Sequence, residues 1–162
     1  MLTFEVISLD CPEDCNLILG QSHFIKTVED ISELLVTSVP GIEYGLAFNE
    51  ASGPCLIRVE GNCAPLVDAA RDNAQRIGAG HIFVLLIRKA YPINFLNGLK
   101  QTQEVCSIYA ATANPIQVIV AQTQQGRGIM GVVDGSSPKG VEGPEDIANR
   151  KSFLRKVTGY KF

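Results

Sequence analysis

The stretch NCAPLVDAARDNAQRIGAGHIFVLLI, residues 62–87, contains the strongest fold signal in the chain. Its first part, with Pro65 near the start, predicts a helix over residues 62–77 that the following glycines end. Residues 81–87 form a nearly unbroken apolar run, typical of a strand covered on both faces. Residues 55–60 are predicted to form a strand before this helix. We therefore expect a right-handed strand–helix–strand crossover.

Strand and helix patterns alternate on both sides of this unit. We predict one α/β domain over residues 1–162, with α/β/α-type layers and a mixed sheet. A short apolar run at 17–19 ends before Gly20, and Thr27 is expected to cap the first helix. The other expected strands cover residues 2–9, 43–50, 105–110, 115–122 and 128–133, and the other expected helices cover residues 27–38, 92–99 and a C-terminal stretch from 144.

The composition excludes several classes of protein. Apolar residues make up 46% and charged residues 19%, which indicates a globular chain. The net charge of −3 argues against a nucleic-acid surface. No signal peptide, anchor or membrane-spanning run is visible, so we expect a cytoplasmic protein. The five cysteines suit reduced thiols, and the pair Cys11 and Cys15 lacks the partners of a zinc site, so no metal site is expected.

The first candidate site is GQSHFIKT, residues 20–27, between a strand and a helix. Amides at a helix start, with Lys26 nearby, can hold a phosphate or another anion. His23 would lie beside that anion as nucleophile, general base or proton donor, with Gln21 contacting the ligand. The alternative is that His23 only caps or packs at this loop.

His81 is the other histidine, and it begins the buried strand. It is either a hydrogen-bonded structural group or a residue at a ligand cleft, since strand ends often border such clefts. We expect His23→Ala to weaken ligand-dependent behaviour more than His81→Ala does. Beyond the strand, Tyr91 is suited to stack on a base and Asn94 to read one, although both are also suited to a helix start.

Two glycine-rich segments follow later in the chain. Residues 126–131 formally match G-x-G-x-x-G, but a strand pattern rather than a helix follows, so the dinucleotide-binding interpretation fails. Residues 134–140 are suited to hold an anion with backbone amides and a lysine, and their aspartate to bind ribose hydroxyls or act as a base. The alternative is a mobile surface loop. The candidate site residues here are Arg127, Asp134, Gly135, Ser136 and Lys139.

Six irregular strings extend over nearly the whole chain: GQSHFIKTVED (20–30), TSVPGIEYGLAFNEASG (37–53), IGAGHIFV (77–84), AYPINFLN (90–97), EVCSIYAATANP (104–115) and GRGIMGVVDGSSPKGVE (126–142). Together they resemble the small archaeal and bacterial proteins called adenosine-specific kinases. The resemblance implies a compact α/β domain that forms a homo-oligomer, for which we favour a trimer or a multiple of it, and that binds adenosine or AMP. It also implies a phosphorylated histidine, and it covers both His23 and His81.

Three functions remain open at this point. The first is an enzyme that transfers phosphate to or from adenosine, with His23 as carrier or base. Phosphoryl transfer often uses Mg²⁺, and no triphosphate-binding motif identifies the phosphoryl donor. The second is an adenosine or AMP sensor without turnover, and the third is a structural oligomer. The first two require the regions near positions 23, 90 and 134 to converge on one nucleoside-sized hollow, within the fold or its assembly.

Overall fold

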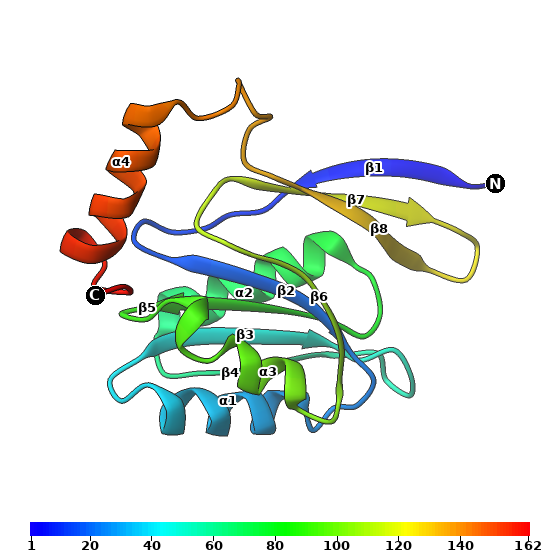
Figure 1. Ribbon diagram of the computed structural model, residues 1–162. Coiled ribbons are helices and arrows are strands. Elements are labelled where there is room, and N and C mark those ends of the chain that lie inside the picture. Colours follow the sequence, from blue (N-terminus) through cyan, green and yellow to red (C-terminus); the bar gives the residue numbers. More distant parts are fainter.

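The computed structural model describes residues 1–162 and contains two antiparallel sheets (Figure 1). One sheet has the strand order β4-β3-β5-β2-β6, and the other has the order β1-β7-β8. The strands are β1 (Thr3–Ser8), β2 (Asn16–Ser22), β3 (Glu43–Asn49), β4 (Ile57–Gly61), β5 (Ile82–Arg88), β6 (Val105–Thr112), β7 (Ile116–Gln122) and β8 (Arg127–Asp134). The helices are α1 (Thr27–Ser38), α2 (Ala64–Ile77), α3 (Leu96–Gln101) and α4 (Pro144–Ser152), with short turns η1 (Pro92–Asn94) and η2 (Phe153–Val157).

The central strand β5 explains the layers. Its side chains alternate between two faces, and nearly all of them are buried, as the apolar run predicts. Val84 and Leu86 face α2 and the three-stranded sheet, in one apolar core. Phe83 and Leu85 face α1 and α3, in a second core. The predicted α/β class is therefore confirmed, with helices on both faces of the larger sheet.

The strand directions correct one detail of the prediction. Strands β4 and β5 are joined through α2, as the crossover prediction requires, but β3 lies between them and is antiparallel to both. Every neighbouring pair of strands in both sheets is antiparallel. The prediction of a mixed sheet, which requires at least one parallel pair, is therefore wrong. The insertion of β3 depends on long-range pairing, which a local apolar pattern does not encode.

The three-stranded sheet is a second departure from the prediction, which assigned its strands to a single sheet. Ile7 of β1 and Val118 and Val120 of β7 share a core with Leu17 and Leu19 of β2. The two sheets are therefore packed together. None of the helices combines the length and apolar character that crossing a membrane requires.

Two helix starts differ from the prediction. Helix α1 begins at Thr27 without a side-chain cap, and the Thr27 hydroxyl instead donates to the carbonyl of Phe24 at 2.5 Å. Helix α2 begins at Ala64, two residues later than expected. Asn62 instead bridges two backbone groups at the start of β3, accepting from the amide of Tyr44 at 2.9 Å and donating to the carbonyl of Ile42 at 2.8 Å.

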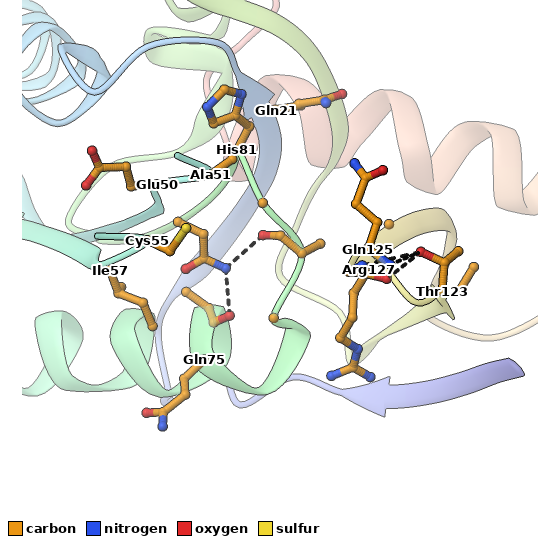
Figure 2. Close-up of a pocket in the computed structure, with 18 residues that line it drawn as sticks. Gln21, Glu50, Ala51, Cys55, Ile57, Gln75, His81, Thr123, Gln125 and Arg127 are labelled. Atoms are coloured by element: carbon orange, nitrogen blue, oxygen red, sulfur yellow. Dashed lines mark hydrogen bonds between the residues drawn. The ribbon is translucent and has the colours of Figure 1, made fainter. Parts of the chain in front are cut away.

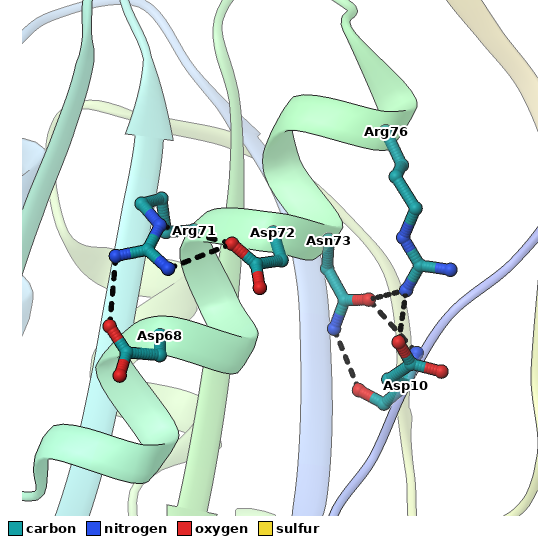
Figure 3. A network of polar contacts seen from close by, with 6 residues as sticks. All are labelled: Asp10, Asp68, Arg71, Asp72, Asn73 and Arg76. Atoms are coloured by element: carbon teal, nitrogen blue, oxygen red, sulfur yellow. Dashed lines mark hydrogen bonds and ion pairs between the residues drawn. The ribbon is translucent and has the colours of Figure 1, made fainter.

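A polar network fastens α2 to the chain that follows β1 (Figure 3). The fully buried Asn73 accepts from the amide of Asp10 at 2.9 Å and donates to its carbonyl at 2.7 Å. Arg76 binds the Asp10 carboxylate at 2.8 Å and the carbonyl of Ser8 at 2.9 Å. Because this network and the apolar core act together, the C-terminal half of α2 is held against both sheets.

The C-terminal segment contrasts with the rest of the chain. Helix α4 has no buried residue and lies apart from the sheets (Figure 1). The residues after it keep large apolar side chains exposed, including Phe153, Val157 and Tyr160. We call residues 141–162 the C-terminal arm.

Candidate functional site

A cavity of about 790 Å³ opens where the two sheets separate. Its walls come from the ends of β3 and α2, the start of β5 and the tip of the β7–β8 hairpin (Figure 2). This volume falls in the usual range for small-molecule sites. The lining residues are Gln21, Asn49, Glu50, Ala51, Cys55, Ile57, Ala74, Gln75, Gly78, Ala79, Gly80, His81, Ala121, Thr123, Gln125, Gly126, Arg127 and Gly128.

His81 on the cavity wall has a left-handed backbone, with φ of 62°. This conformation costs energy for a residue with a Cβ and often marks a functional position. Three contacts hold His81 there. Its amide donates to the carbonyl of Asn49 at 2.7 Å, its carbonyl accepts from the amide of Ser22 at 2.9 Å, and its ring stacks on Phe48 with centroids 5.8 Å apart.

Two other lining residues present buried polar atoms without a partner in the protein. Oδ1 of Asn49 and Nε of Arg127 are both in this position. The guanidinium of Arg127 is otherwise engaged, donating to the carbonyl of Arg76 at 3.1 Å and pairing with Glu5. Since buried polar groups nearly always have partners, these two atoms indicate a place for a ligand or for ordered water.

Three of the residues predicted from sequence meet at this cavity: Gln21, His81 and Arg127. Gln21 lies near the end of β2, where its side-chain oxygen accepts from the hydroxyl of Tyr109 at 3.2 Å. The G-x-G-x-x-G segment forms the hairpin tip and the first part of β8, as expected from its strand pattern. Two of its glycines, Gly126 and Gly128, therefore line the cavity, and the segment does not open a helix.

His23 lies at the same end of the larger sheet but does not line the cavity. Its ring is exposed and stacks on Phe24. The amides of Ser22, His23 and Thr27 all donate to backbone carbonyls, and Lys26 pairs with Asp30 at 3.2 Å. These three amides and this cation are thus engaged within the chain, whereas no hydrogen bond is formed by the amides of Phe24, Ile25 and Lys26.

A carboxyl pair lies beneath this loop. The amide of His23 donates to the carbonyl of Glu104 at 3.0 Å, and the side chain of Glu104 is almost fully buried, at 4% exposure. Burial, together with a hydrogen bond to Asp30, raises the pKa of Glu104, and the same hydrogen bond lowers the pKa of Asp30. The two shifts are opposite in direction, so a proton on this pair is favoured on Glu104 over Asp30.

The remaining predicted residues lie at the opposite end. Asp134 ends β8, where its carboxylate accepts from Thr112 at 2.7 Å and Asn114 at 3.2 Å. Asn94 accepts from the amide of Tyr91 at 2.8 Å, so this pair caps the turn η1. Seven residues of β5 separate this end from His81, a distance of roughly 20 Å. The structure leaves Gly135, Ser136 and Lys139 between β8 and the C-terminal arm.

The thiols are all free. Burial and the neighbouring Cys15 raise the pKa of Cys11 to about 11, and burial also raises the pKa of Cys15, so both are poor nucleophiles. No group of three or more His, Cys, Asp or Glu side chains is arranged to hold a metal ion.

Sequence reasoning missed most of the cavity wall. Asn49, Glu50 and Cys55 flank the β3–β4 turn, which was assigned no chemical role. A polar Asn at the end of an apolar strand is only a weak signal for a binding site. Its role becomes clear only when the position of α2 beside it is known. Thr123 and Gln125 belong to a hairpin whose pairing was also unknown. The missed polar lining residues are Asn49, Glu50, Cys55, Gln75, Thr123 and Gln125.

Comparison with known proteins assigns a class to this fold and cavity. The model of the adenosine specific kinase family matches residues 7–161, so the chain belongs to that family. This confirms the resemblance seen in the sequence and links the chain to adenosine-related phosphotransfer.

A solved structure is also similar over the full length. The crystal structure of PH1918 protein from Pyrococcus horikoshii OT3 is 46% identical, with a TM-score of 0.95. The match covers 100% of this chain and 99% of that one. Among curated proteins, none matches.

Proposed function

We propose that this protein binds adenosine or AMP in the cavity between the sheets and takes part in phosphoryl transfer to the nucleoside. The observation that carries this proposal is a pair of buried, unpartnered atoms, Asn49 Oδ1 and Arg127 Nε, in two residues that line the cavity. One is an acceptor and the other a donor. A nucleoside offers complementary groups, with amine and hydroxyl donors and with ring-nitrogen and hydroxyl acceptors.

A histidine is the proposed phosphoryl carrier. A neutral imidazole nitrogen would attack the phosphorus of a phosphoanhydride donor while the bond to the leaving oxygen breaks. The 5′-hydroxyl oxygen of adenosine would then take the phosphoryl group, and its proton would pass to a base. His81 lines the cavity and His23 is two residues beyond Gln21, so both remain candidates for the carrier.

We further propose that the protein is a homo-oligomer, with a trimer as the favoured form. The C-terminal arm exposes Phe153 and Val157 at 52% and 72%. The outer face of β1 exposes Phe4 and Val6 at 63% and 59%. Exposed apolar surfaces of this kind are typical of protein interfaces. In such an assembly, Asp134, Ser136 and Lys139 of one copy would reach the cavity of another, which restores the convergence expected from sequence.

A cytoplasmic location belongs to the same proposal, because five free thiols suit a reducing compartment.

Calorimetry with adenosine and with AMP tests the binding. Cysteine footprinting then locates it, because Cys55 lines the cavity whereas Cys106, also exposed, does not. Saturating adenosine should slow alkylation of Cys55 and leave Cys106 unchanged. Equal rates at Cys55 with and without ligand, despite calorimetric binding, would place the ligand elsewhere. Absence of any heat with both ligands would reject the proposal.

Turnover is tested with a panel of phosphoryl donors and analysis for AMP. Intact mass after mild alkaline handling should show one added phosphoryl group that is lost in acid, as a phosphohistidine requires. Mixed oligomers of the His81→Gly and Asp134→Asn variants test whether two copies share one site. Each variant alone should be inactive, and mixing should restore part of the AMP-forming activity, because some sites then contain both intact residues.

A sensor without turnover is the second candidate function. It is favoured by the engaged cations, because Lys26 pairs with Asp30 and the guanidinium of Arg127 contacts Arg76 and Glu5, which leaves few charges to stabilise a transferring phosphate within one chain. Adenosine binding with no AMP from any donor would select the sensor.

A further inference from the structure

Asn49 ends β3 with its side chain held in one orientation. Nδ2 donates to the carbonyl of Ala74 at 3.0 Å and to the carbonyl of Ala79 at 2.9 Å. Only the amide nitrogen can satisfy two carbonyls, so the flipped side chain is excluded. Oδ1 is therefore a fixed acceptor, and it is buried without a donor in a residue that is 7% exposed.

The surroundings of Asn49 suit a flat ring. Small residues line this part of the cavity, and two of them, Ala74 and Ala79, are buried as deeply as Asn49. Polar residues at the other side, including Thr123 and Gln125, are exposed. An amphipathic nucleoside would accordingly place its base beside Asn49 and its ribose toward the polar hairpin tip.

We propose that Asn49 is a specificity-determining residue whose Oδ1 accepts a hydrogen bond from the exocyclic amine of adenine. This inference rests on the proposed nucleoside binding in the same cavity. A 6-oxo purine would bring a carbonyl oxygen against Oδ1, so two acceptors would face each other without a proton between them. A purine without a 6-substituent would leave Oδ1 buried and unpaired. Both situations disfavour binding.

Calorimetry on the full-length protein tests the role of the amine with adenosine, purine riboside, inosine and N6,N6-dimethyladenosine. The last three lack a donor at the 6-substituent. Each should bind about ten- to hundredfold more weakly than adenosine, the factor that an unpaired buried acceptor implies. Purine riboside binding within twofold of adenosine would overturn the inference and leave the proposed function standing. Absence of adenosine binding would overturn both.

A variant assigns the effect to Asn49. In Asn49→Ser, the ratio of purine riboside to adenosine dissociation constants should fall to about one. Gln101→Ala is the matched control, because Gln101 also carries an amide but is exposed in α3, away from the cavity, and it should keep the wild-type ratio. An unchanged ratio in Asn49→Ser would overturn the assignment.

The wild-type ligand series does not depend on the folding of that variant. A ribose hydroxyl is the alternative donor that could face Oδ1 in place of the amine. The series therefore also includes 2′-deoxyadenosine and 3′-deoxyadenosine, each of which lacks one such hydroxyl. Tenfold weaker binding of either one, with full-strength binding of purine riboside, would show that a ribose hydroxyl faces Asn49 and would overturn the proposal.

Discussion

His81 combines a left-handed backbone with a position on the cavity wall. The sequence indicated a turn before this residue through Gly78-Ala79-Gly80, and it suggested a border with a cleft. The backbone strain was not predictable, because it results from two hydrogen bonds to residues far away in the chain, at positions 22 and 49. The ranking of the two histidines has the same limitation, since periodicity does not reveal which of them reaches the cavity.

A comparison of His81→Gly with His81→Ala and His23→Ala should separate strain from function. Glycine adopts positive φ without penalty, so His81→Gly should keep or raise Tm, by about 2–4 °C if about 1 kcal/mol of strain is released. It should also weaken adenosine binding, because the imidazole leaves the wall. Thermal melts with and without adenosine measure both effects. If His81→Gly binds like wild type and His23→Ala does not, then His23 is the functional histidine, as the sequence first suggested.

The buried Glu104 should make stability depend on pH. Its folded-state pKa is raised above the ordinary 4.5 by burial and by Asp30. The protonated form is therefore favoured by folding, and its contribution is complete below about pH 4.5 and is lost as pH rises through the folded pKa. Glu104→Gln keeps a neutral donor at every pH, so its Tm at pH 7 should exceed that of wild type, by roughly 2–4 °C for each kcal/mol recovered.

Melts of wild type and Glu104→Gln between pH 4 and 8 measure this dependence. The two Tm curves should converge toward low pH and separate as pH rises. Asp30 has a lowered pKa, so its own contribution is lost only on further acidification, below its ordinary 3.8. Parallel curves across the range would contradict a raised pKa of Glu104 in the folded state.

At the scale of elements, the strands and helices were largely predictable because each carries a local pattern. The helix at 27–38, the end of α2 at Gly78 and the buried strand β5 are confirmed. The helix expected over 92–99 is instead divided into η1 and α3, with Phe95 between them. Pairing was not predictable, because β1, β7 and β8 look like members of a single sheet until their partners are known.

Contact between α2 and β3 gives a prediction at this scale. A Cβ added at Gly45 would lie 2.1 Å from the backbone of Leu66, and backbone cannot move aside cheaply. Gly45→Ala should therefore destabilise the fold by about 3 kcal/mol or more, a fall in Tm of roughly 6–12 °C. Gly131→Ala in β8 is the control, since nothing lies within 4 Å of its added Cβ. Similar Tm values for the two variants would show that the helix is less closely seated than described.

At the scale of the whole molecule, the predicted site residues form two groups at opposite ends of the sheets. Gln21, His81 and Arg127 line the cavity, with His23 at the same end, and Asp134 lies at the opposite end. The family-like sequence strings contain residues of both groups. They do not show that the groups lie far apart, because similarity along a chain gives no information on distances in space. In the proposed oligomer, contacts through the exposed apolar arm would bring the two groups of separate copies together.

Charge placed on the arm should weaken this assembly. Phe153→Asp combined with Val157→Asp puts carboxylates on a surface that is now apolar, so light scattering should give a lower mass than for wild type. Each subunit should keep its far-ultraviolet circular dichroism spectrum, because the arm adds nothing to the cores. Val36→Asp, at a comparably exposed apolar side chain of α1, is the control and should leave the mass unchanged. A wild-type protein that is already monomeric would refute the proposed oligomer.

The side chain of Arg127 joins the hairpin tip to two other elements. Its guanidinium donates to the carbonyl of Arg76 at the end of α2, and it pairs with Glu5 of β1. Local opening of the tip must release both attachments together. Hydrogen–deuterium exchange at the tip and at the last turn of α2 should accordingly proceed at one common rate. Lysine at position 127 lacks the planar fork for two simultaneous contacts, so it would let the two segments exchange independently.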